Sequence, residues 1–91
     1  MSLDSQIANY YEKLVLEDLY KRPEARNLDE DTLADIACLA LSNLPARYYR
    51  HSVDMAFFLT VSALAKMEDE TRAAVGEAVR RVTSGGRDAD D

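Results

Sequence analysis

The stretch DEDTLADIACLALSNLP, residues 29–45, decides how this chain folds. Its acidic start suits the positive end of a helix dipole, and Pro45 disfavours helical geometry at the residue before it, so a helix is predicted from about Asp29 to Asn43. The apolar residues of this segment are Leu33, Ile36, Ala37, Cys38, Leu39, Ala40, Leu41 and Leu44. A helix that is apolar nearly all round is buried, so we expect two other helices and a second subunit to cover it.

Another helix is predicted upstream, from about Asp4 to Lys21, with Asp4 or Ser5 as its N-cap. Its apolar residues recur at helical spacing on one face and are Ile7, Tyr11, Leu14, Val15 and Leu19. Leu16 and Tyr20 fall on the opposite face. Apolar residues on both faces indicate that this helix packs on its own chain and also on something else.

Asp18 lies within the apolar arc of that first helix, where a carboxylate needs an explanation. A buried or half-buried carboxylate is stabilised by a cationic partner, and we expect an arginine such as Arg47 or Arg50. The alternative is an acid that faces a ligand, for example one that accepts from the amide edge of guanine.

The third helix is predicted from Thr60, its N-cap, to about Thr83, because apolar residues recur at helical spacing between them. Residues 52–59 alternate as in a strand, although a short helix joined to the next one is the alternative. A strand there would need a partner, which the symmetry mate in a twofold dimer could supply. We therefore expect one mostly helical, all-α domain over residues 1–83, dimeric, with a disordered acidic tail over residues 84–91.

The composition and the motif content of the sequence argue against several classes of function. The chain has 91 residues and a formal net charge of −6, and a duplex-DNA binder would instead carry clustered Lys and Arg over a whole face. The start of the chain has no secretory pattern, and no run of about 18 apolar residues occurs, so we expect a cytoplasmic protein. The single cysteine, Cys38, is expected to be a small core residue. We expect no metal site, no cofactor and no enzyme, because paired ligands, a nucleophile elbow and a Gly-rich phosphate loop are absent from the sequence.

Side chains that can bind a ligand are concentrated in one stretch of the chain, NLPARYYRHSVDM at residues 43–55. It places two arginines, two tyrosines and the only histidine of the sequence side by side. The arginine fork matches phosphate or the O6/N7 edge of guanine, and a tyrosine ring offers a face on which a base can stack. These side chains suit a nucleotide-like dianion. The alternative is structural: Tyr48 and Tyr49 pack in a core or interface, and Arg47 and Asp54 form an ion pair.

The sequence resembles the late-competence ComFB family of small bacterial proteins. The residues that carry the resemblance are NYYEKLVLEDL at 9–19, DIACLALSNLPARYYRHSVDMAFFLT at 35–60 and, weakly, EAVRRV at 77–82. The resemblance implies a small, nearly all-α domain that dimerises and has a non-enzymatic regulatory role. Members of the family are receptors for cyclic dinucleotides, cyclic di-GMP in particular, with links to competence and surface motility. Some members bind zinc through cysteines, which this sequence, with Cys38 alone, does not support.

The resulting hypothesis is a homodimeric, cytoplasmic receptor for a cyclic dinucleotide, in which two copies of the 45–55 segment meet near the twofold axis. The predicted ligand-binding residues are Arg47, Tyr49, Arg50, His51 and Asp54, with Asn9 and Lys13 nearby on the first helix. Arg47 and Arg50 would take phosphates or guanine edges, and Tyr49 would stack. The alternative function is a protein–protein interaction adapter in a competence or motility pathway that binds no small molecule.

Overall fold

The computed structural model describes residues 6–50 and 59–84. Of the described residues, 72% are helical, and the elements among them are three α-helices, one short 3-10 helix and a small two-stranded sheet. In chain order the elements are β1 (Ile7–Asn9), α1 (Tyr10–Lys21), η2 (Pro23–Ala25), α2 (Glu30–Ser42), β2 (Tyr48–Arg50) and α3 (Val61–Thr83). The all-α prediction is confirmed, with the small sheet as an addition.

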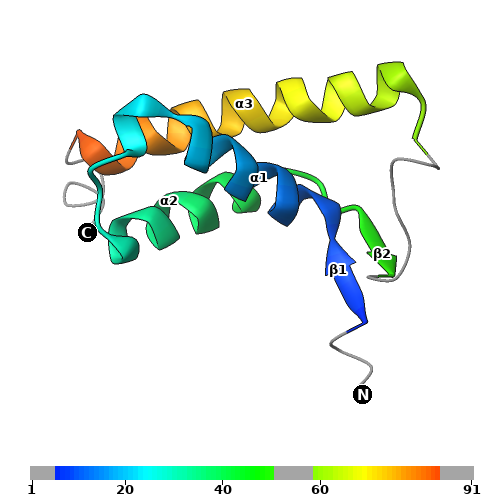
Figure 1. Cartoon of the computed structure of the whole chain (residues 1–91), viewed down its shortest axis with the longest axis horizontal. Helices are drawn as coiled ribbons and strands as arrows, with labels where there is room; N and C mark the ends of the chain where they lie inside the picture. The colour runs from blue at the N-terminus through cyan, green and yellow to red at the C-terminus, as the bar shows by residue number, and fades with distance from the viewer. Residues whose placement is uncertain (1–5, 51–58, 85–91) are drawn as a thin grey trace.

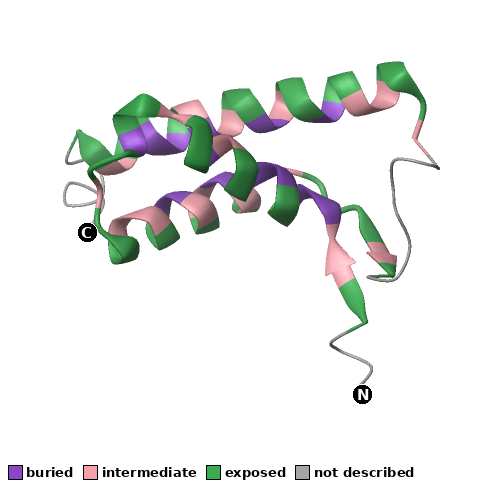
Figure 2. Ribbon diagram, in the orientation of Figure 1, coloured by how far each residue is buried: buried purple, intermediate pink, exposed green. Residues whose placement is uncertain are grey.

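The three helices pack around one apolar core. The longest helix, α3, runs along one side of the molecule, and α1 and α2 both pack against it (Figure 1). Val15 of α1, Ile36 of α2 and Val75 of α3 are fully buried where the three helices meet. Figure 2 shows the buried positions on the facing sides of these helices. The predicted apolar faces are therefore the ones that form the core.

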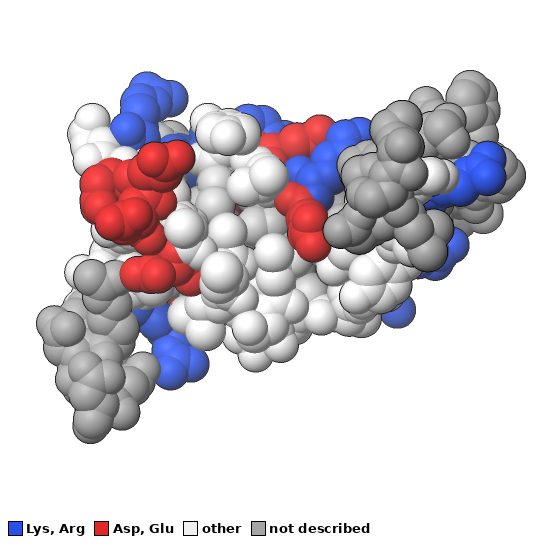
Figure 3. Space-filling view, turned by 90° about the horizontal axis from the view of Figure 1, so that it is seen from below, with Lys and Arg blue, Asp and Glu red and all other residues white. Residues whose placement is uncertain are grey.

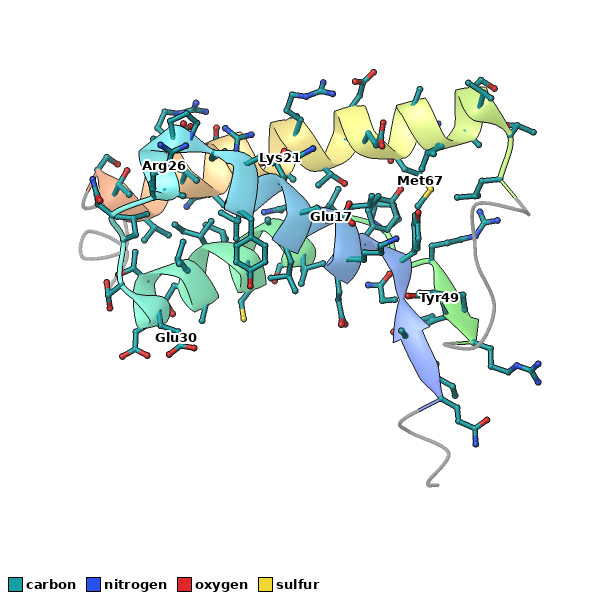
Figure 4. The ribbon with its side chains drawn as sticks, viewed as in Figure 1. Glu17, Lys21, Arg26, Glu30, Tyr49 and Met67 are labelled. Carbon is teal, nitrogen blue, oxygen red and sulfur yellow. The ribbon has the colours of Figure 1, made fainter. Side chains whose placement is uncertain are left out.

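A second apolar cluster joins the helices to the sheet. Tyr10, Tyr11 and Leu14 of α1 are buried with Met67 of α3, and Tyr49 of β2 packs against them. Figure 4 shows Tyr49 and Met67 at the same end of the molecule, on β2 and α3. Because a two-stranded ribbon is marginal by itself, this cluster is what holds the sheet in place.

Two of the predicted helices occur where the sequence indicated. The helix α2 begins after Asp29, and its C-cap is Asn43, two residues before Pro45. The helix α3 begins after Thr60, whose Oγ1 accepts a hydrogen bond from the backbone N–H of Ala63 at 3.0 Å. That bond satisfies one of the free amides of the first turn, so the predicted cap is confirmed.

The predicted start of the first helix was wrong. Helix α1 begins at Tyr10, with Asn9 as its N-cap, and the three residues before it form strand β1. Strand β1 pairs antiparallel with β2, with Ala8 opposite Tyr49. A local helical pattern cannot report a strand partner that lies about forty residues away in the chain, which is why the sequence pattern extended the helix too far.

The prediction of an extended segment over residues 52–59 falls mostly on residues 51–58, which lie outside the described residues. The strand that the structure describes lies just before it, at Tyr48–Arg50. Its partner is β1 of the same chain. A symmetry mate is thus not required to pair this strand.

Helix α2 is less buried than its composition predicted. Only Ile36 and Ala40 are buried, and Cys38 is exposed, so the prediction of Cys38 as a core residue was wrong. The reason is geometric: α1 and α3 cover one side of α2 and leave the other side open. Viewed from below, Figure 3 shows a broad area without charged residues between charged groups at both ends.

The partner predicted for Asp18 was also wrong. The carboxylate pairs with Arg22, one turn further along the chain, rather than with Arg47 or Arg50. Arg22 also pairs with Glu24 and donates from Nη2 to the backbone carbonyl of Arg72 on α3, at 2.8 Å. Arg22 therefore fastens the end of α1 to η2 and to α3, and this satisfies Asp18 within the fold.

Candidate functional site

The side chain of Asn9 fixes the position of the Arg47 backbone. Its side-chain Oδ1 accepts from the backbone N–H of Tyr11 at 3.2 Å and from the backbone N–H of Arg47 at 2.9 Å. The backbone N–H of Tyr10 donates to the carbonyl of Arg47 at 2.7 Å. The predicted ligand residue Asn9 thus has a structural role that the sequence did not indicate: it caps α1 and fixes the backbone of Arg47.

Tyr49 and Lys13 both contact the ring of Tyr10. The rings of Tyr10 and Tyr49 meet edge to face, with centroids 5.6 Å apart and planes at 83°. The Nζ of Lys13 lies 5.4 Å from the centroid of the Tyr10 ring, in a cation–π contact, and 3.9 Å from a carboxylate oxygen of Glu17. Asn9, Lys13 and Tyr49 line one hollow of about 440 Å³, so the structure brings these three predicted residues together.

The described lining of that hollow is not cationic, however. Glu12 and Glu17 lie on its wall beside Lys13. Two carboxylates against one ammonium group give it a negative balance, which disfavours a phosphate. The ring of Tyr49 is half-buried against Tyr10, which is the packing role that the structural alternative assigned to it.

Arg47 lines a different cavity, between the start of α1 and the first half of α3. The cavity has a volume of about 310 Å³, and its walls are formed by Tyr11, Pro45, Ala46, Arg47, Ala63, Lys66, Met67 and Glu70. We call it the Arg47 cavity. Sequence reasoning missed Lys66 and Glu70. Their spacing was a usable signal, because residues 63, 66, 67 and 70 fall on one face of a helix.

A buried tyrosine closes the floor of the Arg47 cavity. The hydroxyl of Tyr11 donates to Glu70 Oε1 at 2.7 Å, and only 4% of Tyr11 is exposed. Burial, and then the hydrogen bond and negative charge of Glu70, raise the pKa of Tyr11 to about 12, while the positive charge of Arg47 acts in the opposite direction. The phenol is therefore protonated at neutral pH, and it holds the Glu70 carboxylate in a fixed orientation.

The remaining predicted residues stand elsewhere. Arg50 is exposed at the end of β2, opposite Ile7, and it lines neither the hollow nor the Arg47 cavity. His51 and Asp54 lie outside the described residues. In the part of the chain that the structure describes, no three His, Cys, Asp or Glu residues come together as a metal site would require.

Fold and site together define a small helical domain with an antiparallel ribbon at one end and an open cavity of mixed charge beside it. The family model described as late competence development protein ComFB matches residues 8–85. The chain belongs to the ComFB family, and the sequence resemblance is thereby confirmed. Membership suggests a competence-related regulatory role.

No curated protein and no solved structure matches the chain. Within the described residues, none of the helices has the length and apolarity that a membrane crossing needs.

Proposed function

We propose that this protein is a non-enzymatic signalling receptor for a cyclic dinucleotide, with cyclic di-GMP as the favoured ligand, and that the Arg47 cavity receives it. One observation carries the proposal. Arg47 and Lys66 line the same cavity although the chain as a whole is acidic, with a net charge of −6. A local pair of cations on an acidic protein suits a small anionic ligand better than an extended polyanion.

The two cations complement each other chemically. The guanidinium of Arg47 can bind a phosphate through two parallel hydrogen bonds, and the ammonium of Lys66 acts as a mobile point charge. The backbone of Arg47 is fixed by Asn9 and Tyr10, so less conformational freedom is lost when a ligand binds. The volume of about 310 Å³ accommodates part of a cyclic dinucleotide and leaves the remainder outside.

We also propose that the active form is a homodimer, joined through the apolar groove between α1 and α2. This groove has a volume of about 400 Å³, and its apolar walls include Leu16, Tyr20, Leu33, Ala34 and Ala37. Leu16 is 46% exposed and Tyr20 is 81% exposed. A 91-residue chain buries only about 60–65% of its unfolded surface, so a second copy that covers this face would add stability that the monomer lacks.

The dimer proposal has a direct test with a matched control. Leu16→Glu places a charge in the groove at an exposed helical position, and Val61→Glu does the same at an exposed apolar residue on α3 outside the groove. Sedimentation equilibrium should find wild type and Val61→Glu dimeric and Leu16→Glu monomeric. A wild-type monomer, or a Leu16→Glu dimer of unchanged affinity, would rule the groove out as the interface.

The receptor proposal is tested by thermal shift with cyclic di-GMP, cyclic di-AMP, GTP and cyclic AMP. A ligand at about 100 times its Kd adds about 2.7 kcal/mol of stability, which is roughly 10–20 °C for a domain of this size. Arg47→Gln and Lys66→Gln should remove most of this shift. The matched controls Arg80→Gln and Lys21→Gln, which change exposed cations outside the cavity, should leave it unchanged.

The groove between α1 and α2 also favours a second function, an adapter that binds another protein and no small ligand. The thermal-shift experiment separates the two functions, because an adapter gains no stability from any of the four nucleotides. In the adapter, Arg47 and Lys66 would be solvated surface cations. In either case the protein would act in a competence or motility pathway without catalysing a reaction.

A further inference from the structure

Glu70 is the feature of the Arg47 cavity that phosphate binding does not explain. Among the described residues that line this cavity, it alone is acidic. A carboxylate on the wall of a phosphate site repels the ligand and lowers its affinity. The presence of Glu70 beside Arg47 and Lys66 therefore indicates a ligand that carries hydrogen-bond donors as well as negative charge.

The bond to Tyr11 does not use up the acceptor capacity of Glu70. An ionised carboxylate offers about four lone-pair sites on its two oxygens, and the phenol of Tyr11 occupies one, on Oε1. Glu70 is half-buried and lines the open cavity, so its other sites are available to a ligand. Since the pKa of Tyr11 is raised to about 12, the phenol stays a donor and does not compete as an anion.

Guanine is the base whose edge fits such a carboxylate. Its Watson–Crick edge presents two adjacent donors, the N1–H and the N2 amino group, whereas adenine presents an acceptor at N1. We propose that the Glu70 carboxylate accepts hydrogen bonds from this edge of a guanine base and makes the Arg47 cavity selective for guanine over adenine nucleotides. The inference rests on the proposed receptor function and names the residue that sets its base specificity.

The charges of the side chains that line the cavity assign a different part of the ligand to each. Arg47 and Lys66 neutralise phosphate, and Glu70, held by Tyr11, reads the base. Tyr11 acts through Glu70 and is a positioning residue, because its hydroxyl already donates to the carboxylate.

The test compares base preference in two variants with the same change. Glu70→Gln keeps the size of the side chain and an oxygen that can accept from Tyr11, so the fold is retained. Glu68→Gln removes the same charge from the same helix, and Glu68 lies outside the Arg47 cavity, in a hollow between α1 and α3. Calorimetric titration with cyclic di-GMP and cyclic di-AMP measures both ligands on wild type and both variants.

We expect Glu70→Gln to bind cyclic di-GMP roughly 10- to 100-fold more weakly than wild type, which corresponds to losing hydrogen bonds to a charged group. Its affinity for cyclic di-AMP should not fall, and Glu68→Gln should match wild type. A Glu70→Gln variant that keeps the wild-type preference for cyclic di-GMP would overturn the inference.

Two further measurements keep the inference separate from the receptor proposal. Cyclic di-IMP lacks the N2 amino groups, so wild type should bind it more weakly than cyclic di-GMP without any change to the protein. Equal affinity for the two ligands would overturn the role of Glu70. If wild type binds neither cyclic dinucleotide, the receptor proposal fails. GTP against ATP on the same variants then decides: a guanine preference lost in Glu70→Gln supports the inference, and no binding overturns it.

Discussion

Removing the hydroxyl of Tyr11 tests the physical description of the cavity floor. Tyr11→Phe keeps the buried ring and deletes only the hydrogen bond to Glu70 Oε1, which is 2.7 Å long. A hydrogen bond to a charged group contributes about 1.5–3 kcal/mol to the free energy of unfolding. We therefore expect Tyr11→Phe to lower the stability of the protein by about 2 kcal/mol at pH 7, measured by urea unfolding.

The pH dependence of this difference is a second observable. The pKa of Tyr11 rises from 10.0 in the unfolded chain to about 12 in the folded protein, so folding favours the protonated phenol. Its contribution is fully present below pH 10 and is lost as the pH rises from 10 to 12, because the unfolded chain then releases its proton first. Two pKa units correspond to about 2.7 kcal/mol, and this sum includes burial, which is the largest cause of the shift, as well as the hydrogen bond and the charge of Glu70.

The assay is urea unfolding of wild type and Tyr11→Phe in parallel from pH 7 to pH 12. Because the four other tyrosines are common to both proteins, the difference between them isolates Tyr11. The difference should be constant up to about pH 10 and then shrink towards zero near pH 12. A difference below about 0.5 kcal/mol at pH 7, or one that does not change above pH 10, would refute this reasoning.

Three further predictions concern the fold and are each measured by urea unfolding at pH 7. Ile36→Ala, at a fully buried position, should cost about 2–5 kcal/mol, and a cost below about 1 kcal/mol would mean that α2 is not packed as described. Arg22→Ala should cost about 1.5–3 kcal/mol, because it removes the partner of Asp18 and the hydrogen bond to α3. The control Arg72→Ala breaks an exposed pair with Asp69 and should cost roughly 0–0.5 kcal/mol. Equal costs for the two variants would contradict the role of Arg22. Thr60→Ala should cost about 0.5–2 kcal/mol through the lost cap of α3, and Thr60→Ser should cost less; an equal loss from both would show that the hydroxyl does not act as the cap.

The sequence predicted a helix end well where the residues that determine it lie close to that end. The acidic start and proline stop of α2, and the threonine cap of α3, depend on residues within one turn of the helix end, and both occur as predicted. The strand β1 could not be predicted in this way. Its three residues continue the helical pattern of α1, and only their pairing with Tyr48–Arg50, far along the chain, makes them extended.

The candidate site was predicted in part. Asn9, Lys13 and Tyr49 lie together around one hollow, whereas Arg47 lines a different cavity. Their surroundings could not be read from the sequence, because Lys66 and Glu70 come from α3 and meet Arg47 only after the helices pack. The same limit explains Asp18, whose partner is set by how α1 ends at Arg22 rather than by the nearest arginine-rich motif.

The open side of α2 shows how composition alone can mislead. A helix rich in apolar residues was expected to be covered, yet Cys38 is exposed and Leu33 and Ala37 are half-buried at the groove. Within residues 6–50 and 59–84, the two other α-helices, α1 and α3, both pack on the same side of α2. The dimer proposal starts from this face because its apolar residues are left partly exposed.

The most direct test of the central claim is a two-dimensional amide NMR titration of the wild-type protein with cyclic di-GMP. If the Arg47 cavity binds the ligand, the signals of Arg47, Lys66 and Glu70 should shift in a saturable manner, while those of Leu33 and Ala37 in the α1–α2 groove should not shift with them. Saturable shifts confined to the groove, or no shifts at millimolar ligand, would contradict the claim that this cavity is a cyclic-dinucleotide site.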